Sequence, residues 1–385
     1  MKAKAPPRYY LDWASTAIPD HKSEDRTVFA NPSSLHEEGR LAKEVLENSR
    51  DRCAKVLGVK PENLYFTSGG TESNALVLHS CLLRREKGRV LYSAVEHPSV
   101  RENCLKLGKL GIKIGVIGVE NDGRVSEETL SKALKKNPDT RLIAIMAVNN
   151  ETGSLMNIKD MVSHVRQNQS VSVPPIHFHS DLVQAVGKVP VNINSCNLDS
   201  ASISAHKLGG PRGIGLLYLK KNMESLFAGG KQEGGIRPGT ENVHGALALA
   251  DLLERRANPK FLAKEEKEAA MRLNYLINNL KKIKRCTLIP EDRQEDDIRF
   301  SPWILQLKFR DIPGAVMVRA LDDLGFAVST GSSCSSTSPD RPVLAAMGLN
   351  ESSRLEGIRI SQGFTTKTSD FEAFLSGLER VLSFL

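Results

Sequence analysis

Two residues of this chain have side chains that could form covalent bonds during a reaction. Cys334 lies in a run of small polar residues, 327–338, and a thiol on such a pliant loop can move. Lys207 stands between a stretch of small residues, 200–206, and a glycine-rich turn, which suits a lysine that is pinned and partly desolvated. Together they indicate a cofactor bound covalently at Lys207 and a mobile sulfur nucleophile at Cys334.

Residues 66–74 have the composition of an anion-binding turn. A glycine pair follows a short apolar run and precedes a helical pattern, and Thr71 adds a hydroxyl. Glycine lets the backbone approach an anion, and the first N–H groups of a helix favour negative charge. A phosphate site fits, although an ordinary helix cap at Ser68 or Thr71 fits these residues equally well. The run is not a Walker loop, because no Gly-Lys-Ser/Thr follows.

Asp181 stands where another apolar run ends, at the place where open α/β sheets bind their ligands. His177 and His179 precede it and could be metal ligands, but no third ligand is evident nearby, so packed or hydrogen-bonded histidines are favoured. Pyridoxal phosphate needs an anion cradle, a partner for its ring nitrogen and a lysine that traps its aldehyde. The three motifs supply these groups and predict this cofactor on Lys207.

These motifs need a scaffold, and short apolar runs that alternate with segments of helical period predict an α/β fold with a mostly parallel sheet. A long helix is expected at 35–57. Strands are expected at 63–67, 90–93, 142–148, 176–179, 200–204 and 215–219. The motifs then fall at strand ends.

After residue 242 the pattern changes to that of a second, smaller α+β domain. Helices are expected at 246–256, 264–283, 314–324 and 370–384, with a strand at 303–309. We therefore predict a large cofactor-binding domain over 15–255. A small domain, 256–385 together with 1–14, carries the Cys334 loop.

Composition argues against several other classes of protein. The chain has 385 residues and a net charge of +8, but only 25% of its residues are charged and 5% are aromatic. The basic runs are short and contain no aromatic residues, which disfavours nucleic-acid binding. The six cysteines lack zinc-ligand spacing, so no metal is expected. No apolar run resembles a signal peptide or a membrane span, so we expect a cytoplasmic protein with reduced thiols.

Seven motifs, in order along the chain, resemble those of the cysteine desulfurases of the NifS/IscS type. These enzymes belong to the class V aminotransferases, which are fold type I pyridoxal-phosphate enzymes. The motifs are 68–74, 96–99, 148–153, 181–184, 204–207, 237–242 and 331–334. The resemblance runs from about residue 9 to residue 366. It implies an aspartate aminotransferase-like fold, with a large domain built on a sheet of the seven-stranded type flanked by helices.

The resemblance also implies roles for individual residues. Lys207 holds the cofactor covalently, His97 stacks on its ring and shuttles protons, and Asp181 pairs with the ring nitrogen. The remaining contacts follow the motifs: Asn150 and Gln184 lie near the ring oxygen or the substrate, and Gly70, Thr71, Ser204 and His206 hold the phosphate. Arg359 clamps the substrate carboxylate, for which a guanidinium is well suited. In a homodimer, Thr240 reaches the phosphate in the other subunit.

The activity that the resemblance implies is removal of sulfur from L-cysteine. The products are L-alanine and a persulfide on Cys334, which passes its sulfur to an acceptor protein for iron–sulfur clusters, thio-cofactors or tRNA thiolation. The identity of this acceptor protein is left open by the sequence. The alternative is a selenocysteine lyase or another class V pyridoxal enzyme, which shares the cofactor residues but does not need Cys334.

The chain departs from the family pattern near its N-terminus, after Arg359 and in the Cys334 loop, which is long as in the NifS/IscS group but slightly shortened. Relatives carry a helix between the segments that correspond to 11–16 and 31–34, whereas here these segments follow each other closely. After Arg359, relatives commonly have Leu-Gly-Arg where this chain has Gln362, Gly363 and Phe364. These changes leave the cofactor residues intact, and they leave open the shape of the substrate pocket, the activity level and the choice of partner.

Overall fold

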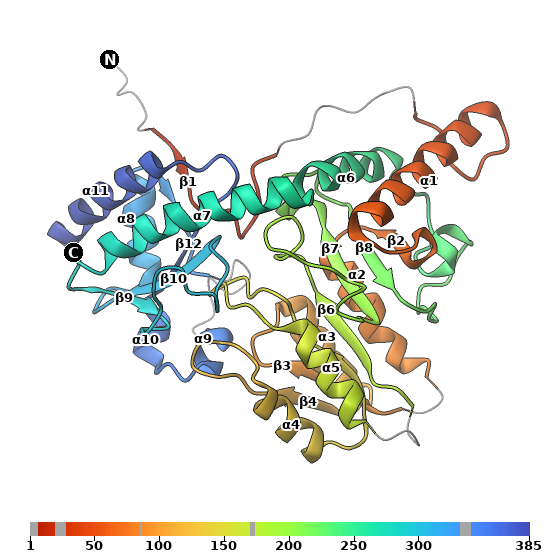
Figure 1. Ribbon diagram of the computed structural model, residues 1–385, viewed down its shortest axis with the longest axis horizontal. Helices are drawn as coiled ribbons and strands as arrows, with labels where there is room; N and C mark the ends of the chain where they lie inside the picture. The colour runs from red at the N-terminus through yellow and green to blue at the C-terminus, as the bar shows by residue number, and fades with distance from the viewer. Residues whose placement is uncertain (1–6, 20–27, 85–86, 170–173, 332–339) are drawn as a thin grey trace.

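The chain folds into a large and a small part, each built on its own sheet (Figure 1). The computed structural model describes residues 7–19, 28–84, 87–169, 174–331 and 340–385. Cys334 lies outside these described residues. The long helix α7, Pro259–Leu280, runs from the large part into the small part (Figure 1).

The large part contains a sheet of seven strands in the order β2-β8-β7-β6-β5-β3-β4. Only β8 is antiparallel to its neighbours, and every other pair is parallel. The bounds are β2 Leu64–Thr67, β3 Arg89–Ser93, β4 Ile114–Ile117, β5 Thr140–Ala144, β6 His177–Asp181, β7 Ser200–Ser204 and β8 Gly215–Leu219. This confirms the predicted α/β fold with a mostly parallel sheet.

Helices cover both faces of this sheet, because alternate strand residues enter two separate cores. On β3, Leu91 joins the core beneath α1, α4, α5 and α6, whereas Val90 and Tyr92 join the core beneath α2 and α3. A strand that is buried on both faces can be apolar throughout, without the alternation of apolar and polar residues seen in half-exposed strands. The bounds are α1 Glu37–Leu57, α2 Gly70–His79, α3 Pro98–Lys109, α4 Glu127–Lys136, α5 Ile158–Asn168 and α6 Val243–Arg256.

The small part contains an antiparallel sheet of three strands in the order β12-β10-β9, covered by α7, α8 and α11. A two-residue strand near the N-terminus, β1 Tyr9–Tyr10, pairs with β11 Phe326–Ala327 and joins the chain's start to this part. The other bounds are β9 Cys286–Ile289, β10 Ile304–Phe309, α8 Gly314–Asp323, α9 Pro342–Ala346, α10 Glu351–Leu355, β12 Gly357–Ser361 and α11 Thr368–Phe384. A domain boundary near 255 stays a prediction.

One expected strand is shorter than predicted. The apolar run 142–148 indicated a single strand, but β5 ends at Ala144. Ile145 and Ala147 still donate N–H bonds to the His179 and Asp181 carbonyls, at 3.1 and 3.0 Å, and remain buried. The apolar run therefore continues past the regular strand, and hydrophobicity alone did not mark its end.

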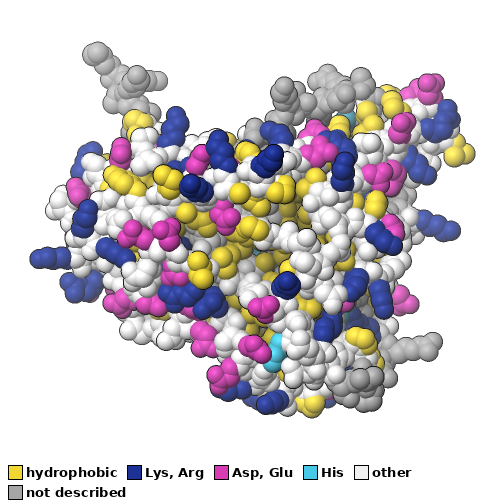
Figure 2. All heavy atoms as spheres, viewed as in Figure 1, with side chains coloured by type: hydrophobic (Ala, Val, Ile, Leu, Met, Phe, Trp, Pro, Cys, Tyr) yellow, Lys and Arg dark blue, Asp and Glu magenta, His cyan; other side chains and the backbone are white. Residues whose placement is uncertain are grey.

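The surface carries charges of both signs (Figure 2). On the face shown, apolar side chains gather between the two parts, and Lys, Arg, Asp and Glu are intermixed around them. No continuous basic patch is present on the described part of this face, which gives it no obvious track for a nucleic-acid backbone. Among the described helices, none combines the length and the apolar composition needed to cross a bilayer.

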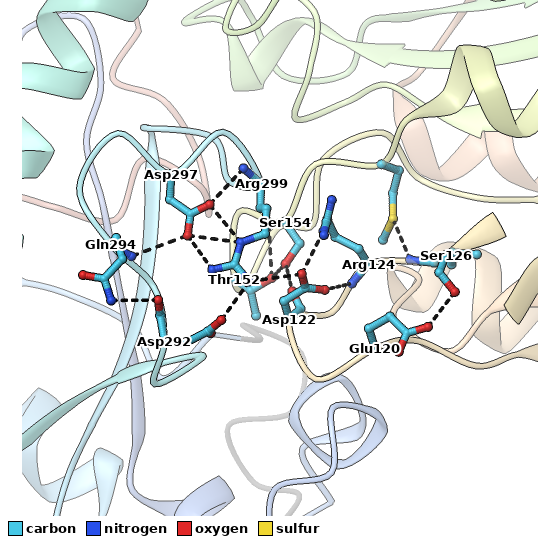
Figure 3. Close-up of polar contacts among 12 residues, drawn as sticks. Glu120, Asp122, Arg124, Ser126, Thr152, Ser154, Asp292, Gln294, Asp297 and Arg299 are labelled. Atoms are coloured by element: carbon cyan, nitrogen blue, oxygen red, sulfur yellow. Dashed lines mark hydrogen bonds and ion pairs between the residues drawn. The ribbon is translucent and has the colours of Figure 1, made fainter. Parts of the chain in front are cut away.

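A polar network ties the two parts together beside the loop 149–155 (Figure 3). The Arg299 guanidinium, from the segment before β10, contacts Asp297 at 2.7 Å, Asp292 at 2.9 Å and Asp122 at 3.5 Å. The Arg299 carbonyl accepts a hydrogen bond from the Leu155 N–H at 2.8 Å. The network thus fixes a loop of the large part, which carries Asn150, against the small part.

Replacing Arg299 by alanine should lower the free energy of unfolding by about 1–3 kcal/mol, because two largely buried carboxylates lose a partner. The side chains of Asp122 and Asp297 are each 9% exposed. Chemical denaturation followed by circular dichroism measures the loss. Arg319→Ala, at an exposed position on α8, is the control and should change the value by less than about 0.5 kcal/mol. Equal losses in the two variants would contradict a role for the network.

Candidate active site

A cavity of about 290 Å³ lies between the large sheet and the small part. It adjoins a second, more open cavity of about 420 Å³ that shares its glycine turn. Ten predicted site residues line the first cavity: Gly70, Thr71, His97, Asn150, Asp181, Gln184, Ser204, His206, Lys207 and Arg359. Thr240 does not line it and is exposed in the segment before α6. Cys334 lies outside the described residues.

Sheet topology explains how these side chains meet. Gly70 follows β2, His97 follows β3, Asp181 ends β6 and Lys207 follows β7. Because these strands are parallel, their carboxyl ends lie at one edge of the sheet. Arg359 comes from β12 of the small sheet, so the cavity is completed by the second part of the molecule.

Lys207 lies in a 3-10 turn, Ala205–Lys207, directly after β7. Its Nζ donates to the carbonyl oxygens of Ala14 at 2.5 Å and Ser15 at 2.6 Å. Burial and the positive charge of Arg359 lower the pKa of Lys207 to about 8. A larger share of this amine than of an ordinary lysine is therefore unprotonated near neutral pH, as a nucleophile or a general base requires.

Asp181 is held by two hydrogen bonds at the end of β6. Its Oδ2 accepts from the Asn74 side-chain amide at 2.8 Å, and its Oδ1 accepts from the Val183 N–H at 2.9 Å. Both bonds hold the carboxylate in place where it lines the cavity. Asp181 can therefore present its carboxylate to a basic ring nitrogen in the cavity.

His177 and His179 are hydrogen-bonded residues of β6, as the sequence favoured. Both rings contact the Ser200 hydroxyl, at 2.7 and 2.8 Å, and His179 Nε2 lies 2.9 Å from Asn74 Oδ1. Burial lowers the pKa of His179 to about 3, so its ring is neutral and donates from Nε2. The described residues contain no group of three or more potential metal-ligating side chains.

His97 belongs to the same network. Its Nδ1 accepts from the Ser99 N–H at 3.1 Å and lies 2.8 Å from the Ser99 hydroxyl. The Asn74 amide donates to that hydroxyl at 2.8 Å. Burial lowers the pKa of His97, which favours a neutral ring with its proton on Nε2. Asn74 thus connects Asp181 to His97, and sequence reasoning missed this although Asn74 and Ser99 stand inside two predicted motifs.

The glycine turn forms the other end of the cavity. Gly69 has φ 146°, and a Cβ added to Gly70 would lie 2.6 Å from the Val183 side chain, so only glycine fits there. The helix α2 begins at Gly70 and points its free N–H groups toward this end. Arg212, which sequence reasoning did not single out, lines the adjoining cavity. A helix start and a guanidinium suit a phosphate group.

Gln184 lies between the cavity and a buried lysine. Its Nε2 donates to the Ala14 carbonyl at 2.8 Å, and its Oε1 accepts from Lys188 Nζ at 3.0 Å. Burial lowers the pKa of Lys188 to about 7. Because the Ala14 carbonyl can only accept a hydrogen bond, the Gln184 amide must direct its Nε2 to that carbonyl and its Oε1 to Lys188.

Arg359 is almost completely buried and reaches three segments at once. Its Nη1 donates to the Asn150 and Gly331 carbonyls at 2.7 and 2.6 Å, and its Nη2 donates to Asp12 Oδ1 at 2.7 Å. Its Nε has no hydrogen-bond partner among the described residues. The guanidinium therefore keeps donor capacity for a carboxylate in the cavity.

The arrangement has the groups that an aromatic aldehyde phosphate would need. An amine of lowered pKa, a carboxylate and a helix start with no room for a side chain face one cavity. A further guanidinium faces the same cavity from the small part. Such a set can bind a pyridoxal-type cofactor together with an amino acid.

Comparisons with known proteins point to one family. The model of the family "Aminotransferase class-V" matches residues 9–374. The chain is 35% identical to "Cysteine desulfurase IscS" of Dictyoglomus turgidum, over 97% of this chain and 94% of that protein. A solved structure described as "NIFS-LIKE PROTEIN" is 31% identical with a TM-score of 0.87, covering 98% of this chain and all of that one. Another, "SspA in complex with cysteine", is 28% identical with a TM-score of 0.76, covering 91% and 98%.

Proposed function

Because the chain belongs to the class V aminotransferase family and is a cysteine desulfurase of the NifS/IscS type, we propose that it takes sulfur from L-cysteine with pyridoxal 5′-phosphate on Lys207. Cys334 then receives the sulfur as a persulfide. The observation that carries this assignment is the cavity in which the Lys207 amine, the Asp181 carboxylate and the Arg359 guanidinium meet.

Each of the cofactor residues is assigned to one part of pyridoxal phosphate. Lys207 binds the aldehyde, Asp181 faces the ring nitrogen, His97 lies on the ring, and Asn150 and Gln184 serve the ring oxygen or the substrate. Gly70, Thr71, Ser204 and His206 hold the phosphate. When bound, pyridoxal phosphate supplies an electron sink for the pair left behind when a bond to the α-carbon breaks.

Arg359 orients the amino-acid substrate. A carboxylate on its free donors places the α-carbon toward Lys207, because both side chains line the same cavity. The free Lys207 amine would take the α-proton as a general base of suitable pKa. The neutral His97 ring offers a second proton-carrying group at Nε2.

The sulfur moves to Cys334. Its thiolate attacks the substrate sulfur, so that an S–S bond forms and the substrate's C–S bond breaks. The carbon keeps that electron pair and takes up protons, which leaves L-alanine and an enzyme persulfide, and no external oxidant or reductant is needed. The persulfide then serves an acceptor protein of an iron–sulfur or thiolation pathway, and we place this exchange in the cytoplasm.

The absorption spectrum of the purified protein tests this function. We expect a visible band from the lysine-bound cofactor, which changes when L-cysteine is added and is accompanied by release of L-alanine. A protein that takes up no pyridoxal phosphate would contradict the proposal. Alanine release from L-selenocysteine without any from L-cysteine would move the assignment to a selenocysteine lyase.

We further propose that the protein works as a homodimer in which Thr240 serves the other subunit. Thr240 is exposed and follows a glycine-rich excursion, 229–239, while its own subunit's cavity is built without it. An exposed hydroxyl outside the cavity of its own chain is available to a second copy.

Mixing Lys207→Ala chains with Thr240→Ala chains should restore activity above the mean of the two parent proteins. Each hybrid dimer then has one site that lacks both residues and one that lacks neither. Co-expression with two different affinity tags isolates the hybrid for a steady-state assay. Activity equal to the mean of the parents would show that Thr240 acts within its own subunit, and a monomer by light scattering would remove the proposal altogether.

A further inference from the structure

A turn near the N-terminus, residues 12–16, lies against the amine of Lys207. This N-terminal turn is closed by hydrogen bonds from the N–H groups of Ser15 and Thr16 to the Asp12 carbonyl, at 3.1 and 3.4 Å. Two consecutive carbonyls of the turn accept hydrogen bonds from Lys207 Nζ. No side chain of the turn makes these contacts, so sequence motifs alone could not reveal them.

The turn is fixed to the strand that carries Arg359. The Ala14 N–H donates to the Ser361 hydroxyl at 2.9 Å, and the Ser361 N–H donates to the Leu11 carbonyl at 2.8 Å. Asp12 Oδ1 accepts from Arg359 at 2.7 Å, with the Arg359 side chain 2% exposed. The two groups assigned above to proton transfer and to substrate binding are therefore held by one short segment.

The geometry of an amine gives these contacts a consequence. A neutral primary amine has two N–H bonds and one lone pair arranged about nitrogen. Lys207 Nζ can donate both N–H groups to the Ala14 and Ser15 carbonyls. The lone pair must then occupy the one tetrahedral position of the nitrogen that is left, so its direction is fixed. When the amine takes up a proton, the new N–H lies in that same direction.

We propose, on the basis of the function assigned above, that the N-terminal turn is a positioning element that aims the lone pair of Lys207 at the α-carbon of the bound substrate. In the step it serves, the Cα–H bond breaks, its electron pair stays with the substrate, and the proton becomes the third N–H of the Lys207 ammonium. The carbonyls hold the amine before and after transfer, so it does not reorient between the two states.

Tyr10 offers a way to loosen the turn without touching the cavity. Its hydroxyl donates to the Thr16 carbonyl at 2.8 Å and lies 3.1 Å from the Asp12 carbonyl. Tyr10 is not among the residues that line the cavity. Tyr10→Phe removes these contacts and keeps the ring, which packs at 6.1 Å from the Trp13 ring.

The adjacent Tyr9 provides a matched control for the same substitution. Its ring stacks on Phe326 at 5.1 Å, and no contact of its hydroxyl with the turn is found in the described structure. Tyr9→Phe and Tyr10→Phe therefore differ by one position on the same short strand, and only the second loosens the turn.

The test compares L-cysteine with its α-deuterated form in the two holoenzyme variants. Tyr10→Phe should lower kcat by about tenfold, with little change in KM, because one well-placed hydrogen bond is lost. Its deuterium isotope effect on kcat should rise above that of the wild type, since proton transfer becomes slower than the other steps. Tyr9→Phe should keep the wild-type rate and isotope effect.

A second measurement needs no activity. In cofactor-free protein, the pH dependence of acetylation at Lys207, followed by mass spectrometry, gives the pKa of its amine, which is about 8 in the wild type. Loosening two acceptors destabilises the ammonium, so the curve should move to lower pH in Tyr10→Phe and stay in place in Tyr9→Phe. The charged and titratable groups facing the amine are the same in all three proteins: Asp12, His97, Asp181, Lys188, His206 and Arg359.

Identical isotope effects and acetylation curves in the two tyrosine variants would overturn the inference. This failure is separable from failure of the proposed function. If borohydride reduction fixes the cofactor on Lys207 while both variants behave alike, only the role of the turn is lost. If reduction fixes no cofactor there, the function assigned to the site is wrong.

Discussion

Replacing Lys207 by alanine should abolish cysteine turnover and, in the same protein, the absorption band of the lysine-bound cofactor. Both depend on one amine, which lies in the cavity at lowered pKa. Loss of the covalent attachment and of the general base should cost at least about 10³-fold in rate. Spectroscopy and an alanine assay on the same sample measure the two effects together.

Two variants sharpen this experiment. Lys207→Arg keeps the positive charge but cannot bind an aldehyde, so it should be as inactive as the alanine variant. Lys220→Ala, at an exposed position just after β8, should keep both the band and the rate. Retention of the covalent band in Lys207→Ala would show that another lysine, with Lys188 the nearest buried alternative, carries the cofactor.

Replacing Cys334 by serine should separate the two covalent centres. We expect the cofactor band and its response to L-cysteine to persist, because the cofactor residues are unchanged. Persulfide formation should disappear and alanine release should fall by about 10²-fold or more, because a hydroxyl is far less nucleophilic toward sulfur than a thiolate. Spectra, alanine release and a persulfide label report on the three steps separately.

Cys196→Ser is the matched control for that substitution. Cys196 is half-buried and free, and burial raises the pKa of its thiol, which disfavours the reactive thiolate. This variant should behave as the wild type. Wild-type rates of alanine and sulfide release in Cys334→Ser would make Cys334 a bystander and favour a lyase that does not need it.

Much of the site was predictable because its residues follow strands whose apolar runs are easy to recognise. Asp181 and Lys207 stand at the ends of β6 and β7, where parallel topology forces ligand groups to one edge. The glycines of the turn were predictable for a different reason. At Gly70 the neighbouring Val183 side chain leaves no space for a Cβ, so a glycine at this position indicates that the backbone lies close to another segment.

Contacts that depend on distant segments were not predictable in this way. Asn74 meets His179 and Asp181 across more than a hundred residues of sequence, and Asp12 meets Arg359 across 347. Neither pair leaves a spacing pattern, because register and domain packing bring them together. β12 was missed although its five residues are all buried, since a strand this short lacks a distinctive period.

The first residues of two helices were also not predictable from apolar periodicity. The helix expected at 264–283 begins at Pro259, because Asn258 caps it by accepting from the Lys260 N–H at 3.0 Å and Pro259 suits the first helical position. The helix expected at 246–256 begins at Val243 for a similar reason, with Asn242 as its cap. Apolar periodicity locates the body of a helix, whereas a single polar side chain decides where it starts.

We propose that sulfur passes from L-cysteine to Cys334, and that the cofactor is attached to Lys207 before and after each turnover. The most direct measurement is a single turnover of the holoenzyme with L-cysteine in the absence of reductant, followed by alanine quantification and peptide mass spectrometry. We expect one alanine for each persulfide, with the added sulfur on the peptide that contains Cys334 and, in a second sample reduced with borohydride, the cofactor adduct on the peptide that contains Lys207. Alanine formed without a persulfide on Cys334, or sulfur found on another cysteine, would contradict it.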